Sequence, residues 1–306
     1  MSRISTNLVL LPMLLLGYGM LLAQSISSHR TIVNIGFLDD EREEMVNWKP
    51  GVSADRLVRP AFQKTETGWA SVDPNSFPPQ MHWSVGFDGK VIAQPQSRTW
   101  SESSPVKLLT FAQSIVPSSL PIPTVGTPKA KYAPLGMGPT QGRRPLVLVS
   151  QPYVNDPDGW GRLVEPSIEL VSAVRRAYRK DFQHVYRCKE EKVVQHEWRF
   201  PDSALIVLDA YSSNKGSHLL RVSLEAGDCG YVDDSNDALS SPWYFIPATG
   251  SAKRVGSFMT LLDAGDYDND GRSEVIFMVA QPEDTEGFAL FDADMHERAR
   301  LLWTYH

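Results

Sequence analysis

The sequence predicts an α+β protein that is dominated by antiparallel β-sheet and has one main helix. Short apolar runs, alternating or rich in β-branched residues, recur along the chain, and turn-forming residues separate them. Residues 166–183 are the one stretch that repeats apolar side chains convincingly at helical spacing. After residue 145 about eight strands are expected beside this helix, a proportion typical of a sheet-dominated α+β fold.

The N-terminal segment is typical of an exported protein. Arg3 precedes an apolar run over residues 8–22, and small residues follow at positions 23–25. We therefore expect a signal peptide over residues 1–25 and an extracytoplasmic protein, either periplasmic or secreted. The run is short and interrupted by Pro12, so no stable membrane span is expected after cleavage. An uncleaved N-terminal membrane anchor is the alternative.

Three regions are expected after the signal peptide. Residues 26–112 are predicted to form a small β-rich module, and residues 145–306 a larger α+β module. Between them, residues 113–144 are predicted to be a linker, because residues 113–145 hold seven of the 22 prolines, with Ser and Gly between them. Proline removes backbone donors and fixes φ, so neither a sheet ladder nor a helix is expected there.

Strands can be assigned locally within both modules. Asp88-Gly89 sits between two apolar runs and predicts a tight hairpin turn over residues 82–93. Residues 39–80 show no sustained periodicity. The other expected strands are 31–38, 105–111, 145–149, 192–198, 204–208, 218–224, 243–246, 258–262, 274–279, 287–291 and 300–305.

The predicted helix has two distinct faces. Its apolar stripe, expected to face the core, consists of Ile168, Val171, Val174, Tyr178 and Phe182. Its opposite face carries four basic residues, Arg175, Arg176, Arg179 and Lys180. A solvated face near the C-terminal end of a packed helix is the preferred interpretation of this basic cluster, and an anionic ligand is the alternative.

The sharpest chemical signal is an acidic loop near the C-terminus. Asp266, Asp268, Asp270 and Glu274 occupy positions 1, 3, 5 and 9, with Gly271 at position 6. These carboxylates would repel one another without a counter-ion. Calcium takes about six to eight oxygen ligands from flexible loops of this type, and glycine permits the sharp turn. We therefore expect bound Ca²⁺, with the Arg272 carbonyl as a backbone ligand at position 7. A turn without any metal is the alternative.

The loop is not an EF-hand, because position 12 is Phe277 rather than glutamate. With an expected strand on each side, residues 257–280 resemble one FG-GAP or VCBS-type repeat, the unit of integrin-like propellers, in an exported bacterial-type protein. The resemblance implies five calcium ligands: Asp266, Asp268, Asp270, the Arg272 carbonyl and Glu274. That family usually has aspartate at the ninth position, where this chain has Glu274. There is no second DxDxDG loop, so a complete β-propeller is not expected.

Other candidate sites have simpler explanations. Cys188 and Cys229 both follow the signal peptide, and we expect them to form a disulfide in an oxidising compartment. A second acidic group could form a weaker cation site, but a solvated loop is preferred: Glu225, Asp228, Asp233, Asp234 and Asp237. Four tryptophans could stack on sugar rings, but caps on β cores are preferred: Trp69, Trp100, Trp160 and Trp243. The histidines lack zinc-site spacing, and no GxSxG motif is present.

These observations predict an exported calcium-binding protein of structural, binding or adhesion type, in which the acidic loop stabilises a β-hairpin. A net charge of −6 argues against a nucleic-acid partner. A protein or carbohydrate ligand fits this class, and the sequence identifies neither. The alternative is an exported hydrolase that acts on polysaccharide or another polymer and carries a structural calcium. Because every local catalytic signature is absent, a non-catalytic role is favoured.

Overall fold

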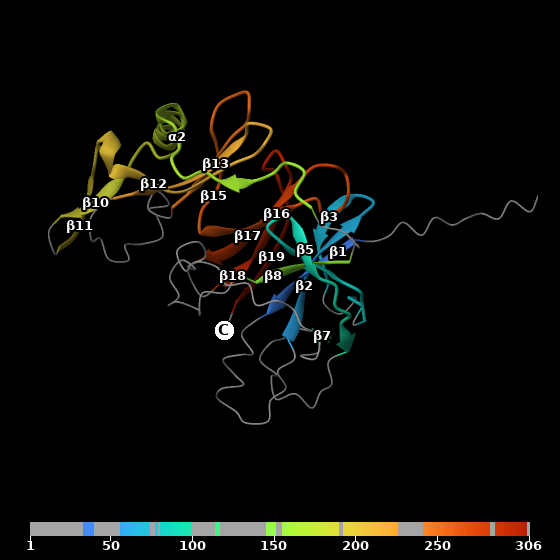
Figure 1. Cartoon of the computed structure of the whole chain (residues 1–306). Coiled ribbons are helices and arrows are strands. Elements are labelled where there is room, and N and C mark those ends of the chain that lie inside the picture. The colour runs from blue at the N-terminus through green and yellow to red at the C-terminus, as the bar shows by residue number, and fades with distance from the viewer. Residues whose placement is uncertain are drawn as a thin grey trace, which may run out of the picture. The chain divides into compact units, whose positions relative to one another are not determined.

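Antiparallel β-sheet makes up most of the described chain, and α2, the one α-helix in the described residues, accompanies it (Figure 1). The computed structural model describes residues 33–39, 56–73, 77–78, 80–99, 114–116, 145–150, 155–189, 192–225, 241–281 and 285–304. All of them belong to a unit that spans Ile32–His306. The described strands close into neither a barrel nor a propeller, so the predicted fold class is confirmed.

The first sheet has eight strands in the order β5-β4-β8-β1-β2-β7-β6, with β3 paired to β2. The strands are β1 (Val33–Asp39), β2 (Arg56–Thr65), β3 (Gly68–Ser71), β4 (Ser84–Phe87), β5 (Lys90–Ala93), β6 (Arg98–Thr99), β7 (Ser114–Val116) and β8 (Leu146–Val149). Strand β8 lies between β4 and β1, so the sheet crosses the boundary predicted at residue 144. All four residues of β8 are buried, as expected for a strand with neighbours on both sides and side chains packed over it.

The predicted hairpin over residues 82–93 is confirmed by β4 and β5. Asp88 and Gly89 have φ values of 48° and 70°, the left-handed conformations that a two-residue primed turn requires. The expected linker, in contrast, contains β7, which pairs with β2 and β6. The predicted strand 105–111 lies outside the described residues.

Strands β2 and β3 lie in residues 39–80, where no periodicity was found. Pro60 interrupts the pattern of β2, yet the strand tolerates it because of its position. The register opposite β1 shifts between Ile35 and Gly36, which leaves Ala61 as an extra residue. On its other edge, β2 pairs with β7 before Pro60 and with β3 after it. A proline is accommodated at such a bulge because no ladder hydrogen bond needs its missing N–H.

The second sheet has the order β15-β14-β13-β12-β9. Its strands are β9 (Gly161–Arg162), β12 (Leu205–Ser212), β13 (His218–Leu224), β14 (Trp243–Ile246) and β15 (Lys253–Gly256), and a separate pair is formed by β10 (Tyr186–Lys189) and β11 (Lys192–Glu197). A 3₁₀ turn, η3 (Asp202–Ala204), leads into β12. The expected strands 204–208 and 218–224 are confirmed by β12 and β13, which pair with each other.

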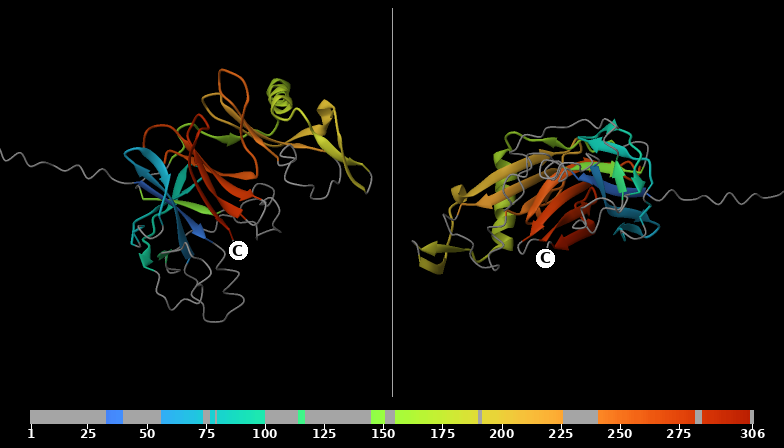
Figure 2. Two further views of the ribbon diagram at one scale, coloured as in Figure 1. Left: turned by 180° about the vertical axis from the view of Figure 1, so that it is seen from behind. Right: turned by 90° about the horizontal axis from the view of Figure 1, so that it is seen from below.

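Helix α2 (Ile168–Asp181) lies beside this second sheet in both views of Figure 2. Ser167 caps it by accepting a hydrogen bond from the Leu170 amide. Val174 and Tyr178 are fully buried in a cluster that includes Leu220 and Tyr244, so the centre of the predicted stripe is confirmed.

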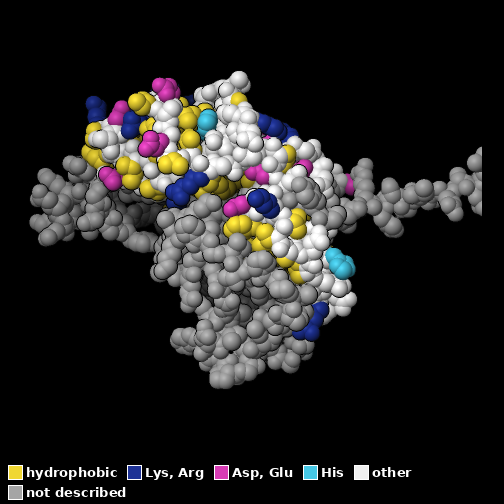
Figure 3. Space-filling model, viewed as in Figure 1, with side chains coloured by type: hydrophobic (Ala, Val, Ile, Leu, Met, Phe, Trp, Pro, Cys, Tyr) yellow, Lys and Arg dark blue, Asp and Glu magenta, His cyan; other side chains and the backbone are white. Residues whose placement is uncertain are grey.

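The first residue of that stripe was wrongly predicted to be buried. Ile168 is 79% exposed, and the nearby Val164 is 88% exposed, because the helix contacts its sheet further along. On the basic face, Arg179 lies 2.5 Å from Asp202 and donates to the Phe200 carbonyl. On the face shown in Figure 3, acidic, basic and hydrophobic side chains of the described residues are interspersed.

The third sheet is a four-stranded meander of β16 (Met259–Gly265), β17 (Glu274–Gln281), β18 (Thr285–Phe291) and β19 (Glu297–Thr304). Strand β17 contributes side chains to two cores. Ile276 belongs to a cluster with residues of β1, β2 and β8, whereas Phe277 belongs to one with residues of β13 and β14. Burial on both faces explains why the β17 sequence is an almost continuous apolar run.

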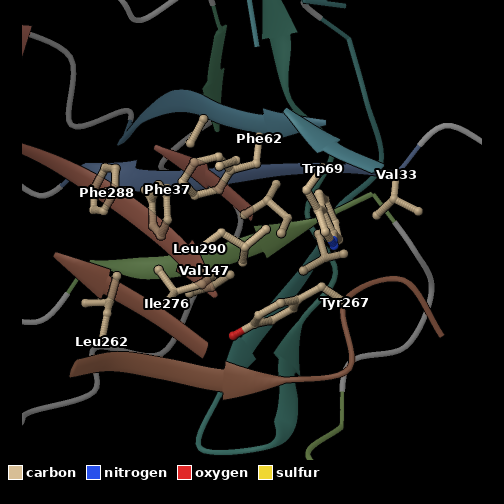
Figure 4. Close-up of a cluster of buried hydrophobic side chains, with 14 of the residues drawn as sticks. Val33, Phe37, Phe62, Trp69, Val147, Leu262, Tyr267, Ile276, Phe288 and Leu290 are labelled. Carbon is tan, nitrogen blue, oxygen red and sulfur yellow. The ribbon is translucent and has the colours of Figure 1, made fainter. Parts of the chain in front are cut away.

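The first of these cores determines where the acidic loop lies. Phe37 of β1 stacks on Phe288 of β18, with 3.6 Å between the ring centroids. Trp69 and Tyr267 lie toward the same end of this cluster, and Leu262 and Phe288 toward the other (Figure 4). Tyr267 is itself part of the acidic loop, so the packing fixes that loop against the β2–β3 hairpin.

Candidate metal centre

The acidic loop is the connection between β16 and β17. Gly265 and Glu274 form the pair that closes the ladder, so residues 266–273 form the hairpin loop. Asn269 and Gly271 have φ values of 59° and 85°, in the left-handed region that asparagine tolerates and glycine favours. The predicted arrangement of strand, acidic loop and strand is therefore confirmed.

Three of the predicted ligand residues converge in this loop. Asp266, Asp268 and Glu274 each offer one carboxylate oxygen, and these atoms all lie within 4.8 Å of one another. Asp266 and Glu274 are only 6% and 5% exposed, and the side chain of Asp268 is 4% exposed. Buried like charges at this separation are costly unless a cation or protons neutralise them. This buried acidic cluster can hold a metal ion.

Backbone amides orient all three of these carboxylates, and Oδ1 of Asp268 accepts from the Asp270 amide at 3.2 Å. Asp266 accepts hydrogen bonds from the amides of Asp270, at 3.0 Å, and Gly271, at 2.9 Å. Glu274 accepts one from the Tyr267 amide at 2.9 Å. A carboxylate oxygen has two lone pairs, so each oxygen held in this way can still coordinate an ion.

The electrostatics of the cluster favour proton or cation uptake. Burial, followed by the charges of Asp268 and Asp270, raises the pKa of Glu274 to about 8. Burial also raises the pKa of Asp266, against the opposing effect of the Gly271 and Asp270 amides. A carboxyl group with a raised pKa is one whose charged form lacks compensation. The metal-free cluster therefore carries less than its full negative charge near neutral pH.

The other two predicted ligand residues lie outside this three-residue group. Asp270 is exposed, and its carboxylate accepts a hydrogen bond from the Arg272 amide at 2.9 Å. The Arg272 side chain forms two hydrogen bonds of 3.1 Å each with Asp294. Coordination by the Asp270 carboxylate and by the Arg272 carbonyl stays a prediction.

The β2–β3 hairpin contributes two side chains that no sequence motif connects with the loop. The Lys64 ammonium lies 2.5 Å from Oδ2 of Asp268. The Trp69 indole N–H donates to Oε1 of Glu274 at 3.4 Å, across 205 residues of sequence. Neither residue belongs to a local motif, so their roles become visible only in the folded chain.

A second segment, residues 155–160, holds both ends of the loop. The Asp266 amide donates to the Asn155 carbonyl at 2.6 Å. At the other end, the Ser273 hydroxyl donates to Asp156 at 2.5 Å and accepts from the Asp158 amide at 3.1 Å. In the sequence, this segment showed only turn-forming composition.

The remaining candidates divide into buried groups and residues outside the described part. Trp69 and Trp243 are 9% and 1% exposed, which confirms that they pack in cores and contradicts sugar stacking at these positions. Trp160 is half-buried. Cys188 lies in β10 and Cys229 outside the described residues, so the disulfide stays a prediction. Also outside the described residues are Trp100, Asp228, Asp233, Asp234, Asp237 and the expected signal peptide over 1–25.

Comparisons with protein-family models, curated proteins and solved structures found no significant match. Among the described residues, no helix is both long and apolar enough to span a bilayer. The geometry of the acidic cluster is the structural feature from which a function can be inferred.

Proposed function

We propose that the loop 266–274 binds one Ca²⁺ ion, and that the chain is an exported calcium-binding protein of structural, binding or adhesion type. The observation that carries this proposal is the convergence of three carboxylate oxygens, from Asp266, Asp268 and Glu274, within 4.8 Å of one another. The predicted carbonyl of Arg272, the carboxylate of Asp270 and water would complete the coordination.

The chemistry of the donors favours calcium over other ions. The group contains only carboxylates and no histidine or cysteine, and hard oxygen donors suit Ca²⁺ or Mg²⁺ better than transition metals. Mg²⁺ demands near-ideal octahedral geometry and retains its water, whereas Ca²⁺ accepts the irregular oxygen sets of a turning loop. Three carboxylates carry up to three negative charges, and a divalent ion neutralises most of that charge.

The role of the ion would be to join elements that lie far apart in the sequence. Glu274 begins β17, while its hydrogen-bond partner Trp69 lies in β3, and Ser273 contacts the segment at Asp156. An ion that binds only the folded state adds RT ln(1 + [L]/Kd) to stability, about 2.7 kcal/mol at a concentration of 100 Kd. Calcium outside the cell would thus stabilise the β16–β17 hairpin and its contacts.

The resemblance to one FG-GAP or VCBS-type repeat supports the same proposal, because the strand–loop–strand order is that of the repeat. Export belongs to the proposal as well, with residues 1–25 as the signal peptide and an uncleaved N-terminal anchor as the alternative. N-terminal sequencing of the exported protein distinguishes a chain that begins near Ser25 from one that retains Met1.

Calcium titration of the EDTA-treated protein by calorimetry tests the proposal. We expect about one Ca²⁺ per chain, much weaker Mg²⁺ binding and a higher melting temperature with calcium. Asp268→Asn should abolish the heat and the shift in melting temperature, because it removes a charged ligand from the buried group. Asp294→Asn is the matched control, since Asp294 contacts Arg272 at the surface and lies outside the group. Absence of both signals in the wild-type protein would sink the proposal.

A further inference from the structure

We propose that Lys64 is a tethered cation that occupies the acidic cluster without metal and leaves Asp268 when the divalent ion binds. This inference rests on the proposed calcium site and adds a residue that sets its affinity. The carrying observation is that the Lys64 ammonium lies 2.5 Å from Oδ2 of Asp268, a buried oxygen that accepts no backbone hydrogen bond in the described part of the chain.

Lys64 and its cross-strand neighbour Trp69 both contact the acidic cluster. Lys64 and Trp69 are register partners in the antiparallel β2–β3 pair, so their side chains leave the same face of the hairpin. The ammonium lies 5.4 Å from the centroid of the Trp69 ring. Lys64 thus contacts Asp268 while Trp69 contacts Glu274, and one cross-strand pair touches two carboxylates of the group.

An ammonium group and a divalent ion cannot both occupy the space beside Asp268. Each needs the same carboxylate charge, and the two cations repel each other at short range. The Lys64 side chain is 35% exposed, whereas that of Asp268 is 4% exposed. Lysine has a flexible four-carbon stem that can redirect its charge to water. The lysine side chain is therefore the part that moves, and the buried aspartate stays in place.

Removal of the Lys64 charge should destabilise the metal-free protein and strengthen calcium binding. In Lys64→Met the aliphatic stem is retained, but Asp268 loses its cation, so the metal-free protein becomes less stable. The same change removes a competitor for the metal, so calcium affinity rises. A lysine with a purely structural role would lower stability without raising affinity.

The test compares calcium titrations of the wild-type full chain, Lys64→Met and Arg221→Met, with melting curves in EDTA. Arg221 is the matched control because it pairs with Asp209, whose side chain is also nearly buried at 6% exposure but lies outside both the acidic group and the segment 155–160 that holds the loop. We expect Lys64→Met to melt at a lower temperature in EDTA and to bind calcium about tenfold more tightly. Arg221→Met should keep the wild-type calcium affinity.

Tryptophan fluorescence supplies a second readout, because the ammonium leaves the Trp69 ring when calcium binds. We expect calcium to change the emission of the wild-type protein and to change it much less in Lys64→Met.

If Lys64→Met does not fold in EDTA, Lys64→Gln, which can still donate a hydrogen bond to Asp268, replaces it with the same expected rise in affinity. Unchanged or weaker calcium binding by the Lys64 variant, with the wild type binding normally, overturns the inference. No binding by any of the three proteins overturns the calcium site itself.

Discussion

Substitution of Glu274 by glutamine tests the electrostatics of the metal-free cluster. Burial and the neighbouring aspartates raise the pKa of Glu274 from 4.5 to about 8 in the folded chain. The folded state therefore holds this proton more tightly than the unfolded chain does, and protonation stabilises the fold. That contribution is fully present below pH 4.5 and is lost progressively as the pH rises through about 8.

The expected size of the change in stability follows from the difference between the two pKa values of Glu274, 4.5 and about 8. Between the two pKa values, a single group changes the free energy of unfolding by at most about 1.4 kcal/mol per pH unit. Over the whole interval the upper limit is about 5 kcal/mol. Glutamine does not titrate, so Glu274→Gln removes this slope. The variant should be less stable than the wild type at pH 5, where it loses a carboxyl group that fits the site. As the pH rises, this difference in stability should shrink.

Urea unfolding in EDTA at pH 5, 6, 7 and 8 measures the effect. We expect the difference in free energy of unfolding, wild type minus Glu274→Gln, to fall by about 1 kcal/mol per pH unit. Glu165→Gln, which removes an exposed carboxylate outside the cluster, controls for the loss of one acidic side chain. With excess calcium the trend should reverse, because metal binding requires the deprotonated carboxylate. Parallel curves for the wild type and Glu274→Gln in EDTA would refute the argument.

Two further substitutions test the structure around the site. Ser273→Ala removes the hydroxyl that joins Asp156 and Asp158 to the loop and leaves the buried Asp158 amide without this acceptor. We expect a loss of about 1–3 kcal/mol in urea unfolding, against little change for Ser257→Ala, whose hydroxyl accepts an exposed bond from Arg254. Gly287→Ala places a Cβ against the Leu301 carbonyl oxygen, whereas a Cβ at Gly161 meets nothing within 4 Å. A strong loss of soluble, folded protein is thus expected for Gly287→Ala only, and equal melting temperatures for the two variants would contradict this packing.

The elements with purely local signals were predictable from the sequence. Asp88-Gly89 defined its hairpin because few residue pairs adopt two positive φ values. The spacing of Asp266, Asp268 and Glu274 indicated a cation loop because a turn of that length brings its alternate side chains together. Helix α2 was recognisable from its apolar spacing and its flanking residues. In each case the interactions that decide the conformation lie within a few residues of one another.

Tertiary structure decided what surrounds these elements. Strand β2 was missed because Pro60 is acceptable only beside a bulge that its pairing with β1 creates. Ile168 continued the helical stripe but is exposed, since no element of the described chain covers that turn. Lys64 and Trp69 reach the acidic cluster across about 200 residues. Such contacts depend on which distant surfaces are buried together, and burial is a property of the whole folded chain that short-range patterns do not encode.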